Sequence, residues 1–111
     1  NKTIMPLAAR ETDSVATGHG CDGSTTLAVP GQTTVFIEAL LAARLGDLTV
    51  SHAQPAGDAC VPHTAPIAGS SGTVYIVGAK AARKTDSCDA GSITGSAVDV
   101  YIGDYWLTIL S

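Results

Sequence analysis

The sequence predicts an all-β fold in which three pseudo-repeats close into a cone, a β-prism-like pyramid with approximate threefold symmetry. Three observations lead to this fold class: a repeated motif, a second element repeated in step with it, and a strand-forming composition. The motif is Ala-Ala-Arg-x-x-Asp, and its copies occupy residues 8–13, 42–47 and 81–86. Three copies in so short a chain indicate a repeat architecture rather than chance.

The second element has the sequence TVFI, TVYI or DVYI and occupies residues 34–37, 73–76 and 99–102. It precedes the second and third Ala-Ala-Arg copies by the same interval, and its last copy has none after it. The sequence therefore begins and ends within a repeat. If the C-terminal DVYIG completes the unit that the N-terminal MPLAAR opens, the units form a ring and the two ends of the chain lie close together.

Each second element favours a β-strand, because β-branched and aromatic residues are concentrated there between Gly, Ser and Pro. Segment 37–45, IEALLAARL, has a helical composition, but its counterpart at 76–84, IVGAKAARK, carries Gly78 at the matching place. A tight turn between two strands suits both segments, so we expect hairpins and keep a helix as the alternative. Alternation along each strand leaves open which apolar residues face outward.

The Ala-Ala-Arg-x-x-Asp motif is expected to hold the body together rather than to catalyse a reaction. Two small residues allow chains to approach closely near an axis. An Arg with an Asp three positions later can form an ion pair or satisfy backbone groups at a turn. A symmetric body repeats its structural contacts, whereas an enzyme rarely needs a catalytic pair in triplicate.

The length and composition fit one domain over residues 1–111. We expect residues 1–4 to be a cloning remnant and residues 104–111 to form a short C-terminal extension. With 6 basic and 10 acidic side chains the formal net charge is −4, which argues against nucleic acid as a partner. The three cysteines are an odd number, so disulfides alone leave one thiol over, and this favours a metal site.

Metal ligands are expected in the loops that follow the three motif aspartates. His19 follows the first motif, His52 and His63 follow the second, and Cys88 follows the third. Threefold closure brings these loops together at one end, so the metal site lies near the tip of the cone. Three imidazoles and one thiolate suit tetrahedral Zn²⁺, and four protein ligands leave no position for a reacting water. The predicted zinc is therefore structural, and its binding contributes to folding.

These motifs resemble those of the PAAR-repeat proteins, the conical caps at the tips of type VI secretion spikes and contractile phage tails. The resemblance extends from about Met5 to Gly103 and rests on AAR after Pro6-Leu7, the TVFI and TVYI elements, and the segments TGHG, CVPH and DAGSITGS. It implies a β-pyramid whose blunt base sits on a trimeric β-helical spike protein. It also implies a metal near the vertex, bound by three His and one Cys, which match His19, His52, His63 and Cys88.

The other two cysteines depart from the family pattern or compete with it. Cys21 stands where many relatives carry a small residue, and it lies two residues from His19. Cys60 and His63 have a Cys-x-x-His spacing that can clamp zinc, so Cys21 and Cys60 are alternative ligands. A disulfide between these two cysteines is slightly favoured over two inert, buried thiols. Iron is disfavoured, because the sequence contains no His-x-His pair.

The resemblance implies a structural protein without enzymatic activity, one cap per spike trimer, which pierces the target cell envelope in a transient contact. A phage tail is favoured over the tip of a type VI secretion apparatus. Two other functions are retained as alternatives. One is a zinc-stabilised receptor-binding or adhesive β module, for which Tyr105 and Trp106 are the candidate aromatics. The other is a small secreted metal-dependent hydrolase, which is disfavoured because no strand-to-helix turn presents a Cys nucleophile.

Overall fold

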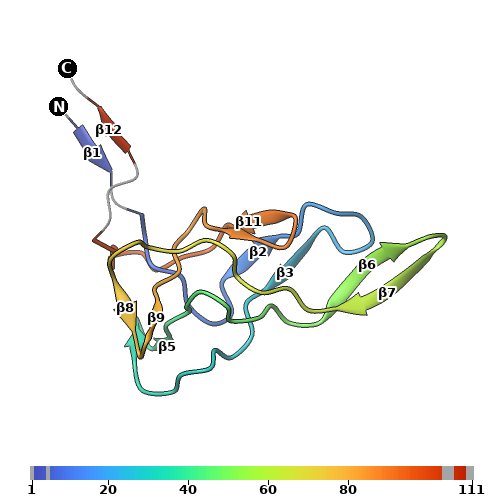
Figure 1. The fold of residues 1–111 in the computed structure, drawn as a ribbon, viewed down its shortest axis with the longest axis horizontal. Helices are drawn as coiled ribbons and strands as arrows, with labels where there is room; N and C mark the ends of the chain where they lie inside the picture. Colours follow the sequence, from blue (N-terminus) through green and yellow to red (C-terminus); the bar gives the residue numbers. More distant parts are fainter. Residues whose placement is uncertain (1, 5, 104–106, 110–111) are drawn as a thin grey trace.

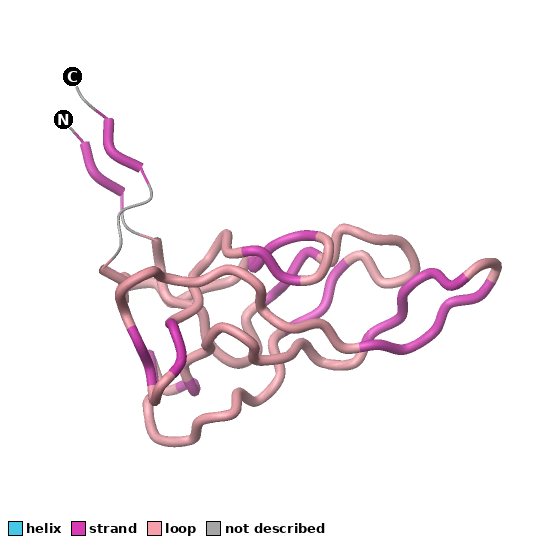
Figure 2. The backbone as a smooth tube through the Cα atoms, in the orientation of Figure 1, coloured by secondary structure: helices cyan, strands magenta, loops and turns pink. Residues whose placement is uncertain are grey.

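The computed structural model describes residues 2–4, 6–103 and 107–109, so Tyr105 and Trp106 lie outside the described residues. Within these ranges the fold is all-β, with short strands joined by turns and loops and no helix (Figures 1 and 2). The predicted fold class is confirmed, and the helical alternative for segment 37–45 is wrong. The same residues accordingly contain no helix with the length and hydrophobicity needed to cross a bilayer.

The strands are only two to five residues long, and most pair with a neighbour along the chain. In chain order they are β1 (Lys2–Ile4), β2 (Ser14–Ala16), β3 (Ser24–Thr26), β4 (Phe36–Ile37), β5 (Leu40–Leu41), β6 (His52–Ala56), β7 (Ala59–His63), β8 (Tyr75–Ile76), β9 (Ala79–Lys80), β10 (Ser87–Cys88), β11 (Gly91–Ile93) and β12 (Leu107–Ile109). Four of them form a sheet in the order β10-β11-β2-β3, and the others form antiparallel pairs. Contacts between the repeats must therefore supply much of the cohesion of the body.

A closed ring of backbone hydrogen bonds joins the three repeats at the second alanine of each motif. Ala9 N–H donates to the Ala82 carbonyl, Ala82 N–H to the Ala43 carbonyl, and Ala43 N–H to the Ala9 carbonyl, each at 3.0 Å. These alanines are each only 1% exposed, because three segments of the chain meet around one axis. A methyl group is the side chain that such a close approach admits, which explains why the sequence repeats Ala-Ala.

The C-terminal segment completes the repeat that the N-terminal segment opens. Ala8 N–H donates to the Val100 carbonyl at 2.9 Å, as the matching alanines of the other two repeats donate to Val35 and Val74. Ile102 N–H donates to the Pro6 carbonyl at 2.9 Å. Beyond this closure β1 and β12 pair as an antiparallel ribbon that extends away from the body (Figure 1). The predicted closure into a ring is confirmed.

The Arg and Asp of each motif form the expected ion pair, and the Asp also caps a turn. Asp86 accepts hydrogen bonds from the backbone N–H of Arg83 at 2.8 Å and from the guanidinium at 2.8 and 3.0 Å. Asp13 binds Arg10 in the same manner, and Asp47 binds Arg44. Each carboxylate thus fixes the turn after the axial alanines, and that turn directs the following loop away from the axis.

The core consists of two apolar layers stacked along the pseudo-threefold axis. The layer nearer the metal-ligand candidates contains Ala9, Val15, Leu27, Ala43, Ile67, Ala82, Cys88 and Ile93. The other layer contains Ala8, Ile37, Ala42, Ile76, Ala81, Ala97 and Ile102. Each motif contributes one alanine to each layer, so the two layers are continuous through the Ala-Ala pairs.

Candidate metal centre

The β6–β7 hairpin carries two of the predicted ligands. In its register His52 lies directly opposite His63, the first and last residues of the hairpin, so both imidazoles are on the same face. The two-residue turn is Gly57-Asp58, with Gly57 at φ 63°, which is the conformation that a tight hairpin requires of glycine at this place. The hairpin projects from one end of the body (Figure 1), and the two histidines form the pair at its open end, opposite the turn.

His19 comes from the loop between β2 and β3. Gly18 has φ 76°, and a Cβ there would collide with the Ala90 carbonyl. A Cβ on Gly91 would in turn collide with the Ala16 carbonyl. Glycine at both positions therefore allows the His19 loop to lie directly against the β10–β11 hairpin. The Thr17 hydroxyl holds the loop closed by donating to the Asp22 carbonyl at 2.7 Å.

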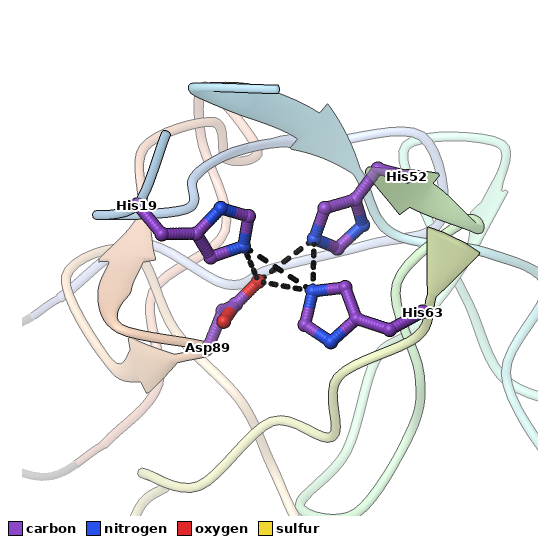
Figure 3. Close-up of side chains that lie close together, drawn as sticks. All are labelled: His19, His52, His63 and Asp89. Atoms are coloured by element: carbon purple, nitrogen blue, oxygen red, sulfur yellow. Dashed lines mark hydrogen bonds and ion pairs between the residues drawn. The ribbon is translucent and has the colours of Figure 1, made fainter. Parts of the chain in front are cut away.

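The fourth side chain of the cluster is Asp89, at the turn between β10 and β11. Asp89 has φ 57°, a left-handed conformation that is uncommon for a residue other than glycine and that Asp tolerates better than most. The Ala90 N–H donates to Asp89 Oδ1 at 3.0 Å, which leaves Oδ2 for the histidines. Such conformations often mark functional sites, and this one points the carboxylate at the three imidazoles (Figure 3).

The four donor atoms converge on one point. Asp89 Oδ2 lies 2.8 Å from the Nε2 atoms of both His19 and His52 and 3.2 Å from that of His63. His63 Nε2 lies 2.8 Å from that of His52 and 3.2 Å from that of His19. All four atoms lie within 4.8 Å of one another. The ligand atoms of a tetrahedral zinc ion are about 3.3 Å apart, so small shifts accommodate the ion.

Hydrogen bonds of the rings show why this cluster fits a cation. The Nδ1 of His19 lies 2.8 Å from the Gly20 carbonyl, and the Nδ1 of His52 lies 2.9 Å from the Val50 carbonyl. A carbonyl only accepts, so each Nδ1 carries the proton, and in a neutral ring Nε2 is left with a lone pair. Lone pairs on two nitrogens thus face a carboxylate oxygen. A divalent metal ion, or protons on the rings, must offset the repulsion between these lone pairs and the carboxylate. Histidines that bind a metal typically donate their other ring N–H to a carbonyl, as His19 and His52 do here.

Protons and a metal compete for the same atoms. The hydrogen bond to the Gly20 carbonyl, together with Asp89, raises the pKa of His19 above its usual value, although partial burial opposes this. Burial works to raise the pKa of Asp89, but the hydrogen bonds that His52 and His19 donate when their Nε2 atoms carry a proton outweigh it and hold that pKa below its usual value. The carboxylate is therefore charged and available as a ligand at neutral pH.

The structure brings His19, His52 and His63 together as predicted, but it does not bring Cys88 to them. Cys88 is a free cysteine, fully buried in the core layer. Burial, with a smaller contribution from the Asp89 charge, raises the pKa of its thiol to about 11, so the sulfur stays protonated. Alternation between strand and turn sends Cys88 into the core and the next residue toward the histidines. In the cluster that could hold a metal ion, the fourth side chain is Asp89, and Cys88 is not a member.

A comparison of the repeats contains the signal that the sequence analysis missed. Cys88 stands two residues after its motif aspartate, as Val15 and Thr49 do in the other repeats. All three are buried and form equivalent antiparallel bridges, to Ile67, Ile93 and Leu27 respectively. The position is thus a core position in every repeat. The residue that follows this core position, Asp89 in the third repeat, is the one whose side chain joins the cluster.

Cys21 and Cys60 form a disulfide with a Cα–Cα distance of 5.9 Å. The bridge links the His19 loop to β7, and neither of its cysteines belongs to the group of four donor residues. Both cysteines are exposed. Because two of the three cysteines in the chain are paired, the buried Cys88 is the remaining free thiol.

Replacement of Asp89 by Asn is expected to weaken zinc binding at least about tenfold, because a neutral amide replaces the charged ligand oxygen. Cys88→Val is the matched control, since the first repeat has Val15 at the same place. It should leave the affinity within about threefold. Competition with a chromophoric chelator measures both. The opposite order, with Cys88→Val abolishing binding and Asp89→Asn leaving it intact, would restore the thiolate as the ligand.

Comparison with known proteins gives a single assignment. A family model described as PAAR motif matches residues 17–96, well over half of the chain. No relative among curated proteins matches. The matched span holds the four cluster residues, the disulfide and two of the three Ala-Ala-Arg copies. With the closed threefold body and the convergent histidines, it shows that the chain belongs to the PAAR-motif family, which is associated with the tips of contractile phage tails and type VI secretion machines.

Proposed function

We propose that this chain caps and sharpens the trimeric β-helical spike of a contractile injection machine. The observation that carries the proposal is an exposed aromatic residue repeated three times at the same position. Phe36, Tyr75 and Tyr101 are the third residues in the three copies of the second element, and they are 59%, 60% and 55% exposed. A single chain that offers three equivalent contacts matches a partner with threefold symmetry.

The exposed aromatics lie on the outer side of the strands whose inner side forms the core. Ile37, Ile76 and Ile102, the next residues, point into the core layer and are less than a tenth exposed. Strands β5, β8 and β9 lie at the end of the body opposite the β6–β7 hairpin (Figure 1). The aromatic end therefore forms the proposed base on the spike, and the hairpin end forms the proposed tip. Large aromatic residues are typical anchors of protein interfaces.

The rim of the proposed base is rigidly tied across repeats. The Glu38 carboxylate, at the β4–β5 turn, accepts hydrogen bonds from the backbone N–H groups of Val98 and Asp99 at 2.7–3.1 Å. It also accepts one from the Arg10 guanidinium at 3.3 Å. The two backbone N–H groups, with a smaller contribution from Arg10, hold the pKa of Glu38 below its usual value. A fixed rim is what a base needs to present three contacts at once.

At the other end we propose a structural Zn²⁺ held by His19, His52 and His63, with Asp89 as the fourth ligand. Imidazole and carboxylate are ordinary zinc ligands, and four protein ligands leave no open position for chemistry. The role that follows is mechanical and non-catalytic. Zinc ties a loop and a hairpin that share little apolar core, so the tip can transmit the force of a contracting sheath to the envelope of the target cell.

Tyr75→Asp is expected to weaken binding to a trimeric β-helical spike protein by about thirtyfold or more, because a charge is buried without a partner. Titration calorimetry measures the affinity, and light scattering should give one cap per trimer. Val29→Asp is the control, since Val29 is 67% exposed on the loop between β3 and β4. Equal loss in both variants, or unchanged binding in Tyr75→Asp, would count against the proposed base.

The proposed location is the tip of a phage tail, with the tip of a type VI secretion apparatus as the alternative. Neighbouring genes distinguish the two: capsid genes beside the sheath genes indicate a phage, and their lack indicates a secretion machine. If the chain does not bind the spike, glycan binding would instead support the adhesive alternative, and hydrolysis of a substrate would support the enzymatic one.

A further inference from the structure

Two segments that carry the cluster histidines are also joined by a disulfide. Cys21 lies two residues after His19 in the β2–β3 loop, and Cys60 lies in β7 three residues before His63. The two cysteines are 39 residues apart in sequence. The disulfide and the donor cluster therefore cross-link the same loop to the same hairpin, at two neighbouring places.

Few other contacts hold the loop against the hairpin. Asp22 N–H donates to the Ala53 carbonyl at 3.1 Å, and Ala53 N–H donates to Asp22 Oδ2 at 2.8 Å. Within residues 18–23 no side chain is buried. Exposed hydrogen bonds contribute little net stability, so these two alone hold the loop weakly.

The hairpin is as weakly supported as the loop. Among the described strands β6 pairs only with β7, and between His52 and His63 every residue is half-buried or exposed. An isolated two-stranded hairpin is at best marginally stable in water. The relative position of His19 and the two hairpin histidines therefore depends on the cross-links.

We infer that the Cys21–Cys60 disulfide and metal binding at the His19, His52, His63 and Asp89 cluster are thermodynamically coupled, so that the tip is a redox-gated metal site. The inference rests on the proposed metal centre and adds a regulation to it. The oxidised chain presents the histidines already close together and binds metal tightly. The reduced chain must first order the loop and binds metal more weakly.

The coupling acts in both directions. Each cross-link removes conformational freedom that the other would otherwise have to remove, so each favours the other. Linkage requires the two effects to be equal: the factor by which the disulfide raises metal affinity is the factor by which metal shifts the thiol–disulfide equilibrium toward the disulfide. Couplings of this kind are commonly about tenfold.

The redox step needs a thiol reductant, and the exposure of both cysteines gives it access. A monothiol such as glutathione attacks one sulfur of the bridge as its thiolate, forms a mixed disulfide with that cysteine and releases the other cysteine. A second glutathione thiolate then attacks the glutathione sulfur of the mixed disulfide and releases the remaining cysteine. Two electrons and two protons pass to Cys21 and Cys60, which become thiols. The two reductant molecules leave as one disulfide, so atoms and electrons balance.

The first test compares zinc affinities of the oxidised chain, the glutathione-reduced chain and the double variant Cys21→Ser with Cys60→Ser, by chelator competition. We expect the oxidised chain to bind zinc about tenfold more tightly than both other forms. The variant needs no reductant, and its serines are not zinc ligands. If the reduced chain binds as tightly as the oxidised chain while the variant binds weakly, the freed thiols take the metal and the inference is wrong.

Two further measurements guard against a misfolded variant. For the unaltered chain, thiol titration in glutathione redox buffers measures the thiol–disulfide equilibrium with and without zinc. Zinc should shift that equilibrium toward the disulfide by the same factor by which the disulfide raises the zinc affinity. In metal-free protein, amide hydrogens of residues 18–22 should exchange faster in the double variant than in the oxidised chain, while those of the axial alanines should not change.

The outcomes separate this inference from the metal centre itself. Zinc binding of equal affinity in all three forms overturns the coupling and leaves the metal centre standing. No zinc binding in any form overturns the metal centre and the coupling with it. In that case the exchange of residues 18–22 still reports whether the disulfide orders the loop.

Discussion

Removal of the metal by a chelator is expected to lower the midpoint of thermal unfolding by about 15 °C. A ligand that binds only the folded state at a concentration about 1,000 times its dissociation constant contributes about 4 kcal/mol. For a domain of this size each kcal/mol shifts the midpoint by about 4 °C. The structural reason is the cluster itself, where two Nε2 lone pairs face the Asp89 carboxylate and, without a cation, repel it. Differential scanning calorimetry measures the shift.

The chelator should leave the midpoint of a His63→Ala variant nearly unchanged, because that variant has already lost a ligand. The effect should also depend on pH. The pKa of His19 is raised in the metal-free fold, so its protonated form stabilises that fold below pH 6.5, and this contribution is lost as the pH rises through the folded-state pKa. Protons displace metal over the same range. The difference in unfolding midpoint between metal-loaded and metal-free protein should therefore be largest above neutral pH and become smaller as the pH falls. A difference that grows on acidification would contradict the site.

Ala43→Leu at the axis is expected to destabilise the fold by about 3 kcal/mol or more, since overpacking a filled core forces the backbone apart. Ala43 is 1% exposed and both donates to and accepts from the ring of backbone hydrogen bonds. A leucine there separates three segments of the chain at once, so the loss of packing extends to all three repeats. Denaturant unfolding, followed by circular dichroism, measures the change.

The same substitution at Ala56, which is exposed in β6, is the control and should change the stability by less than about 0.5 kcal/mol. By the pseudo-symmetry, Ala9→Leu and Ala82→Leu should resemble Ala43→Leu. A cost below about 1 kcal/mol at all three positions would mean that the axis has room for a larger side chain, against the close approach described above.

Much of the fold could be predicted because the same sequence pattern occurs three times in the chain. The recurrence of Ala-Ala identified an axis, and the Arg and Asp spacing identified a pair within one turn, a contact that the local chain geometry almost fixes. The hairpin at residues 36–41 could be predicted from the matching repeat, because Gly78 there indicates a tight turn. Segment 37–45 taken alone has a helical composition. Local patterns were sufficient wherever the contact partners lie within a few residues or in equivalent positions.

The cluster was harder to predict because its members come from different repeats. The three histidines could be proposed together only through ring closure, and the structure brings their Nε2 atoms to one place. The fourth side chain depended on one residue of register, since Cys88 and Asp89 are neighbours that point in opposite directions. Composition favours the thiol as a zinc ligand, whereas the direction of the side chain favours the carboxylate.

The sequence by itself determined the threefold β body, the structural role of the Ala-Ala-Arg-x-x-Asp motif and the three histidines. These follow from repetition and from interactions short in sequence, which a pattern records directly. Only the tertiary structure decided that Asp89 completes the cluster and that the aromatic residue of each strand faces outward. Both depend on which side of a strand meets the axis, and that is set by the packing of three chain segments that are distant in sequence.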